Sequence, residues 1–273
     1  MAHEYVNWSG SMRFTPAEIA EPKDEQEVVE TVRRAAGDGR TVRPVGSGHS
    51  SMPIFATDDV LMSLEHLAGL VDHDADAGLA RVLPGTGLAR TGELLAEAGL
   101  AMENLGDVDY QAIAGAISTG THGTGVTLGN LSQTMVGGRL VTGSGEVVAF
   151  GVDATEEDPD LVRAAQVSMG SLGVLTSLTL RVVPAYDLHR LNWCTHVDWA
   201  REHFHELARA NRHFDMYWYP RSDDVQIRTL NVPGNEPGIV PPGATVHKDE
   251  SGPSYEILPN SRDYAIRLQY RLG

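Results

Sequence analysis

Two glycine-rich stretches, far apart in the sequence, constrain this chain more than any other feature. The first is Arg-Pro-Val-Gly-Ser-Gly-His-Ser at 43–50, and the second is Gly-Ala-Ile-Ser-Thr-Gly-Thr-His-Gly-Thr-Gly at 115–125. Such stretches expose backbone N–H groups, and glycine lets the backbone approach a bound group closely and adopt positive φ. They therefore predict loops that wrap a phosphate or a flat polar ring. His49, in the first loop, adds a nucleophilic nitrogen beside whatever is bound.

Helices and strands of mixed order surround these loops. Hydrophobic periodicity and capping residues predict helices over 24–38, 91–98, 158–166 and 199–211, and strands over 41–45, 60–64, 79–83, 139–142, 146–150, 174–183, 214–219 and 225–230. This order lacks the regular alternation of a dinucleotide-binding sheet, and neither Gly-x-Gly-x-x-Gly opening a helix nor a phosphate-binding Gly-x-x-x-x-Gly-Lys loop occurs. A change of composition after Pro184, with more tryptophan and histidine, predicts a domain boundary near 184–186. Proline and glycine at 232–253 predict a long flexible loop.

Bulk properties exclude several classes of function. The net charge of −16 argues against a nucleic-acid partner. The single cysteine, Cys194, rules out a disulfide framework and indicates a reducing compartment. The start of the chain lacks a signal-sequence pattern, and no apolar run reaches the roughly 18 residues of a membrane span. We therefore expect a cytoplasmic protein, with peripheral association with a membrane left open. No metal site is expected, because His203 and His205 would point to different sides of a helix.

Three further motifs accompany the two loops in a characteristic order. These are Asn-Trp-Ser-Gly at 7–10, Leu-Gly-Asp-Val-Asp at 105–109 and Ser-Met-Gly-Ser-Leu-Gly-Val at 168–174. Together with the loops, they make the chain resemble the aldonolactone and alditol oxidases of the vanillyl-alcohol-oxidase flavoprotein superfamily, with the greatest likeness to bacterial L-gulono-1,4-lactone dehydrogenases. The resemblance covers residues 6–262.

The resemblance implies an α+β fold in two parts. An FAD-binding domain with two subdomains would occupy residues 1–184, and a partial α+β cap domain for the substrate would occupy residues 185–273. The implied function is FAD-dependent oxidation of a hydroxyl group of a sugar lactone or polyol, such as L-gulono-1,4-lactone, D-arabinono-1,4-lactone or an alditol. Oxygen or another acceptor would take up the electrons.

The resemblance also assigns cofactor residues. In family members with histidine at the position of His49, the flavin is attached covalently through its 8α-methyl carbon; the alternative is a histidine that only hydrogen-bonds the flavin edge. His122 would lie in the pyrophosphate loop, where shaping that loop is its expected role, and Val174 at the adenine end. The full set of implied FAD contacts is Val45, Gly46, Ser47, Gly48, His49, Ser50, Asp107, Ala112, Gly115, Ser118, Thr119, Gly120, Thr121, His122, Gly123 and Val174.

The chain departs from the family pattern at its C-terminal end. Family enzymes continue well beyond the equivalent of residue 273, and a glutamate-rich strand is expected after Asp263 but does not follow. The catalytic residues are therefore expected beyond residue 273, and a truncated, non-catalytic flavin-binding fragment or pseudoenzyme is the alternative to an active enzyme. A third interpretation, a superfamily member acting on an aromatic alcohol, sterol or cytokinin, fits the motifs at 7–10 and 119–125 less well.

Overall fold

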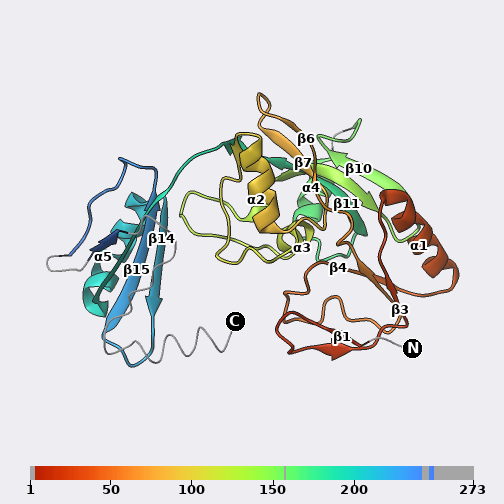
Figure 1. The fold of residues 1–273 in the computed structure, drawn as a ribbon, viewed down its shortest axis with the longest axis horizontal. Coiled ribbons are helices and arrows are strands. Elements are labelled where there is room, and N and C mark those ends of the chain that lie inside the picture. The colour runs from red at the N-terminus through yellow and green to blue at the C-terminus, as the bar shows by residue number, and fades with distance from the viewer. Residues whose placement is uncertain (1–3, 157, 242–245, 249–273) are drawn as a thin grey trace. The chain divides into compact units, whose positions relative to one another are not determined.

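A computed structural model describes residues 4–156, 158–241 and 246–248 of the chain (Figure 1). The chain divides into two compact units. The first comprises Met1–Gly123 and Gly129–Ala185, and the second comprises Thr124–Leu128 and Tyr186–Gly273. Residues 260–273, where the sequence departs from the family pattern, lie outside the described residues.

The first unit begins with a small parallel sheet beside a helix. The sheet has the order β3 (Glu18–Ala20), β5 (Val60–Ser63), β4 (Val42–Val45), and the short strands β1 (Tyr5–Val6) and β2 (Arg13–Phe14) pair separately. Helix α1 (Glu25–Gly37) begins where the Asp24 carboxylate accepts a hydrogen bond of 2.8 Å from the Glu27 N–H. Its buried valines pack against Met62 of β5 and against the larger sheet described next. Helix α1 thus joins the two sheets of the unit.

A five-stranded antiparallel sheet forms the centre of the first unit. Its order is β10 (Val147–Gly151), β9 (Met135–Val141), β11 (Val174–Arg181), β7 (Leu79–Val82), β6 (Leu70–Asp74). Helices α2 (Leu88–Glu97), α3 (Ile113–Ser118) and α4 (Pro159–Gln166) contribute to its main apolar core, in which Phe150, Leu178 and Ile117 are fully buried. The remaining elements are the pair β8 (Leu100–Ala101) and β12 (Val183–Pro184) and the 3-10 turn η1 (Leu131–Thr134).

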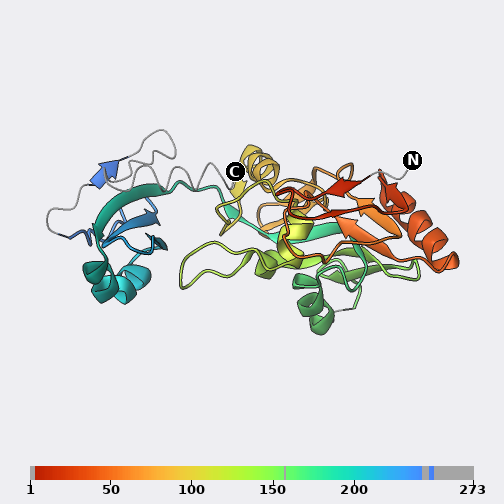
Figure 2. The same cartoon turned by 90° about the horizontal axis from the view of Figure 1, so that it is seen from below.

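The second unit is a four-stranded antiparallel sheet with one long helix. The strand order is β14 (His213–Trp218), β15 (Asp224–Asn231), β13 (His189–His196), β16 (Val246–Lys248). Helix α5 (Val197–Ala210) lies across one face of the sheet (Figure 2). Leu207 of the helix, Trp193 of β13 and Ile227 of β15 form the buried centre of this contact. Among the described residues, no helix has the length and apolar character that crossing a bilayer requires.

The mixed helices and sheets confirm the predicted α+β class, but several predicted elements are wrong in detail. Residues 113–118, partly predicted as loop, form α3, because four apolar side chains there are buried. Strands β6 and β13 were not expected, since neither shows a clear apolar–polar alternation. Within the predicted loop 232–253, residues 246–248 form β16, which pairs with β13. Local composition carries no information about such a distant partner.

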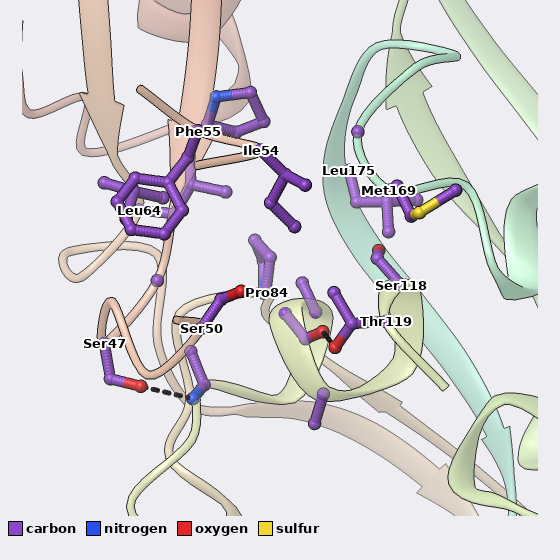
Figure 3. A pocket seen from close by; sticks show the side chains of 18 of the residues that line it. Ser47, Ser50, Ile54, Phe55, Leu64, Pro84, Ser118, Thr119, Met169 and Leu175 are labelled. Carbon is purple, nitrogen blue, oxygen red and sulfur yellow. Dashed lines mark hydrogen bonds between the residues drawn. The ribbon is translucent and has the colours of Figure 1, made fainter. Parts of the chain in front are cut away.

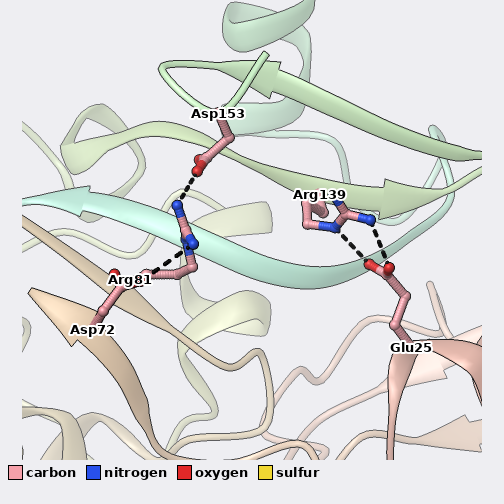
Figure 4. Close-up of polar contacts among 5 residues, drawn as sticks. All are labelled: Glu25, Asp72, Arg81, Arg139 and Asp153. Atoms are coloured by element: carbon pink, nitrogen blue, oxygen red, sulfur yellow. Dashed lines mark hydrogen bonds and ion pairs between the residues drawn. The ribbon is translucent and has the colours of Figure 1, made fainter. Parts of the chain in front are cut away.

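Ion pairs tie the elements of the first unit together across its sheet (Figure 4). The Arg139 guanidinium of β9 donates two hydrogen bonds, of 3.0 and 2.7 Å, to the Glu25 carboxylate at the start of α1. Arg81 of β7 bridges Asp153, at 2.5 Å, and Asp72 of β6, at 3.3 Å. The bidentate geometry of the Arg139–Glu25 pair makes it a specific, charge-assisted link between helix α1 and the sheet.

We expect Glu25→Gln to destabilise the protein at neutral pH but not in acid. The hydrogen bonds from Arg139, with a further one from the Thr176 hydroxyl, hold the pKa of Glu25 below its ordinary value. Since the folded pKa is lowered, the stabilisation is present above the unfolded pKa of about 4.3 and is lost as pH falls through the folded value. The pair is partly exposed, so the expected cost at pH 7 is about 0.5–1 kcal/mol.

Thermal unfolding of both proteins between pH 7 and pH 3 measures this effect. The melting temperature of Glu25→Gln should lie about 1–4 °C below that of the unmutated protein at pH 7, and the gap should close in acid. Glu146→Gln, which changes an exposed carboxylate between β9 and β10, serves as the control. A gap that persists unchanged at pH 3 would contradict the assignment to the ion pair.

Candidate flavin site

One pocket in the first unit gathers residues from several separate segments of the chain, with Leu64 and Pro84 among them (Figure 3). Its walls come from 43–50 after β4, from Ile54 and Phe55, from 111–119 around α3, and from 168–175 before and within β11. It contains about 1070 Å³ of empty space, counted out to its open mouth. Its lining, largely apolar with a few hydroxyl groups and one imidazole, is typical of a site for a cofactor or another small organic molecule.

The two glycine-rich stretches meet at this pocket. The Ser47 hydroxyl accepts a hydrogen bond of 3.2 Å from the backbone N–H of Ala112, just before α3. A Cβ on Gly46 would lie 2.6 Å from the Cβ of Ala112, closer than side chains approach in real structures. Glycine at position 46 therefore allows the first stretch to touch the segment just before α3, the helix that leads into the second stretch.

Gly48 is required for a different reason. Its φ of +63° lies in the left-handed region, and a Cβ there would lie 2.4 Å from the Tyr5 hydroxyl oxygen. Glycine is the residue that adopts this conformation without strain. The turn at Gly48 sets the direction of the chain at His49, the next residue.

His49 lines the pocket and carries an unsatisfied nitrogen. Its Nε2 atom is buried and has no hydrogen-bond partner among the described residues. An orphaned buried polar group costs about 1–3 kcal/mol. A ligand that bonds to the imidazole, or a water molecule, would remove this cost, so the site fits a group that engages His49.

Ten of the residues predicted to contact the cofactor line this one pocket. They are Val45, Gly46, Ser47, Gly48, His49, Ser50, Ala112, Gly115, Ser118 and Thr119. Val174 instead lines a second cavity, which shares Arg43, Pro44, Gly170 and Gly173 with the first. The two cavities are therefore neighbours on the same loops.

The other predicted contacts line neither cavity. They are Asp107, Gly120, Thr121, His122 and Gly123. The exposed His122 ring has its Nδ1 atom 2.9 Å from the Gly123 carbonyl oxygen. A Cβ on Gly123 would lie 2.1 Å from the Leu105 carbonyl oxygen, so packing of the loop itself requires that glycine.

Sequence reasoning missed most of the pocket wall formed by residues 168–175. Ser168, Met169, Gly170, Gly173 and Leu175 line it, although the motif at 168–174 had suggested only family membership. A signal was present in its glycines: Gly170 and Gly173 have φ of +73° and +141°, and a Cβ on Gly173 would meet the Val141 carbonyl oxygen at 2.2 Å. This segment is also a glycine-dependent turn that ends at the pocket.

Comparison with known proteins identifies the class of protein to which this fold and pocket belong. A family model for FAD-binding domains matches residues 16–151, and a model for D-arabinono-1,4-lactone oxidase matches residues 178–250. The solved structure of cholesterol oxidase from B. sterolicum superposes with a TM-score of 0.72 at 20% identity, covering 85% of this chain and 48% of that one. Fold and pocket together define a flavoprotein with the FAD-binding fold of the vanillyl-alcohol-oxidase type.

Individual relatives narrow the class further. L-gulono-1,4-lactone dehydrogenase of Mycobacterium tuberculosis is 39% identical over 241 residues, which make up 88% of this chain and 55% of the relative. D-arabinono-1,4-lactone oxidase of Eremothecium gossypii is 36% identical over 227 residues, or 81% of this chain and 42% of the relative. The chain belongs to the FAD-dependent aldonolactone oxidase family. It spans about half the length of the relatives that it matches.

Proposed function

We propose that this protein oxidises a hydroxyl group of a sugar lactone or polyol with FAD as its cofactor. L-gulono-1,4-lactone and D-arabinono-1,4-lactone, the compounds in the relatives' names, are the first substrates to test, and alditols are the next. Oxygen or another redox acceptor would take the electrons. The observation that carries the proposal is the single pocket that both glycine-rich loops line, in a chain whose relatives are lactone oxidoreductases.

The pocket and its neighbour suit the two ends of FAD. We assign the flavin end to the cavity beside His49 and the adenine end to the neighbouring cavity beside Val174. The FAD-binding domain is then residues 1–184, with a partial cap for the substrate at 185–273. When bound, the flavin accepts the hydride from the substrate carbon. The protein's task is to position the flavin, exclude water and supply a base for the hydroxyl proton.

We also propose that His49 holds the flavin covalently. Its imidazole lines the cavity assigned to the flavin, and its buried Nε2 atom has no partner among the described residues. A neutral imidazole nitrogen is a competent nucleophile. The covalent bond would prevent loss of the cofactor.

The chemistry of the single cysteine supports a proposal about the cellular setting. Cys194 is half-buried, and burial raises the pKa of its thiol, which keeps it protonated and unreactive. A protein with one inert thiol suits a reducing compartment. We propose a cytoplasmic location.

Anaerobic stopped-flow reduction of the bound flavin tests the activity directly. Mixing the yellow protein with L-gulono-1,4-lactone or D-arabinono-1,4-lactone should bleach the flavin absorbance, and air should restore it. A yellow protein that no lactone or alditol reduces would support the flavin-binding, non-catalytic alternative.

A further inference from the structure

The turn at Asn7–Gly10 is bonded to the chain on both sides of His49. The Trp8 backbone N–H donates a hydrogen bond of 3.0 Å to the carbonyl oxygen of Gly48. The Asn7 side-chain amide donates one of 3.1 Å to the carbonyl oxygen of Ser50. Two neighbouring residues of the turn therefore fix the backbone immediately before and immediately after the histidine.

Asn7 is well suited to this task. Its side chain is buried, with the residue 3% exposed, and its Oδ1 atom accepts a hydrogen bond of 2.9 Å from the Met12 N–H. The Asn7 backbone N–H also donates to the Met12 carbonyl oxygen at 3.1 Å. These bonds hold the turn in one conformation, so the groups that it offers to the His49 loop have fixed positions.

Trp8 adds a direct contact with the imidazole. The centroids of the Trp8 and His49 rings lie 4.4 Å apart with an interplanar angle of 27°, which is a stacked geometry. Trp8 is 46% exposed and does not line the pocket. Its other face is available to Tyr110, whose ring centroid lies 6.4 Å away at an interplanar angle of 21°. The Nε2 atom of His49 has no hydrogen-bond partner among the described residues that would fix the ring. Stacking on Trp8 therefore sets the plane of the imidazole.

We propose that Trp8, held by the Asn7 turn, is a positioning residue for covalent attachment of the flavin to His49. This inference rests on the attachment proposed above. In the attachment, one C–H bond of the 8α-methyl group and one N–H bond of the imidazole give way to a C–N bond. The two protons and two electrons released reduce the flavin, and molecular oxygen then reoxidises it, forming hydrogen peroxide. The reaction requires the imidazole nitrogen to be aimed at the methyl carbon, and the Trp8 indole limits the rotation of the ring.

The rate of attachment tests the proposal without any measurement of turnover. Colourless apoprotein, produced under riboflavin limitation, is mixed with FAD in air, and samples are precipitated with acid over time. The flavin absorbance of the pellet reports covalent product, and quenching of FAD fluorescence at early times reports non-covalent binding. The proteins compared are the unmutated chain, Trp8→Ala, Trp8→Phe and the control Trp218→Ala, which removes an exposed tryptophan from the second unit.

We expect Trp8→Ala to slow attachment by between about 10-fold and 100-fold, as small misplacements of a reacting group do. Its non-covalent affinity for FAD should stay near that of the unmutated protein, and Trp8→Phe, which keeps an aromatic face, should recover most of the rate. Attachment by Trp8→Ala at the unmutated rate would overturn the inference, and so would an equal loss in Trp8→Phe and Trp218→Ala. An unmutated protein that binds FAD but never yields an acid-stable pellet would instead overturn the attachment to His49 itself.

Discussion

Replacing His49 by alanine is expected to abolish acid-stable flavin completely while leaving non-covalent FAD binding measurable. The loss follows because alanine offers no nucleophile at the one pocket position with a buried, unpartnered ring nitrogen. Binding should survive because the loop is shaped by other groups: the Ser47 hydroxyl, the left-handed turn at Gly48 and the Asn7 turn. Acid precipitation of each protein, followed by spectra of pellet and supernatant, measures the difference.

The matched control for this prediction is His73→Ala. His73 lies exposed on β6, at the edge of the five-stranded sheet, and is no part of the pocket lining. Its pellet should be as yellow as that of the unmutated protein. A yellow pellet from His49→Ala would show that another residue holds the flavin, and a colourless pellet from the unmutated protein would show that none does.

The second large effect is expected from Gly46→Val. A Cβ at position 46 would lie 2.6 Å from the Ala112 Cβ, so the loops after β4 and before α3 must move apart. Both loops are walls of the pocket, and overpacking of this kind costs about 1–3 kcal/mol. If that cost falls on the bound state, the affinity for FAD weakens by between about 5-fold and 150-fold.

Titration of the apoproteins with FAD measures this loss, and Gly92→Ala provides the control. Gly92 lies within helix α2, and a Cβ there would meet no atom within 4 Å. Alanine at such a site is expected to stabilise the protein slightly, by about 0.4–1 kcal/mol. Unchanged FAD affinity in Gly46→Val would show that the contact between the two loops is not needed for the cofactor site.

The sequence predicted the pocket better than it predicted the elements around it. Glycines with a steric role carry a local signal, which is why the stretch at 43–50 pointed to residues that line a pocket. The second stretch was harder, because Ile113, Ala116 and Ile117 are buried by tertiary packing and turn its beginning into a helix. Glycine, serine and threonine in the same stretch favour a loop in a sequence-based prediction, so the helix at 113–118 is not predicted.

The missed features share a different cause. The wall at 168–175 and the strand β16 exist because of partners that are distant in the sequence: the loops at 43–50 and 111–119 in one case, and β13 in the other. The role of Trp8 is also invisible in the sequence, where it stands far from His49. Contacts of this kind require the fold, since no local pattern encodes which segments become neighbours.

Under the proposed attachment, different residues provide the binding of FAD and its covalent tethering. The hydrogen bonds and glycines around position 49 shape the binding loop, and the side chain at 49 provides the tether. The groups described as shaping this turn belong to other residues, namely Gly46, Ser47, Gly48, Asn7 and the Trp8 backbone. The side chain at 49 is therefore free to change by a single codon without rebuilding the loop. Within a lineage that keeps this turn, permanent tethering of the cofactor could be gained or lost in one evolutionary step, while the underlying capacity to recruit it is inherited unchanged.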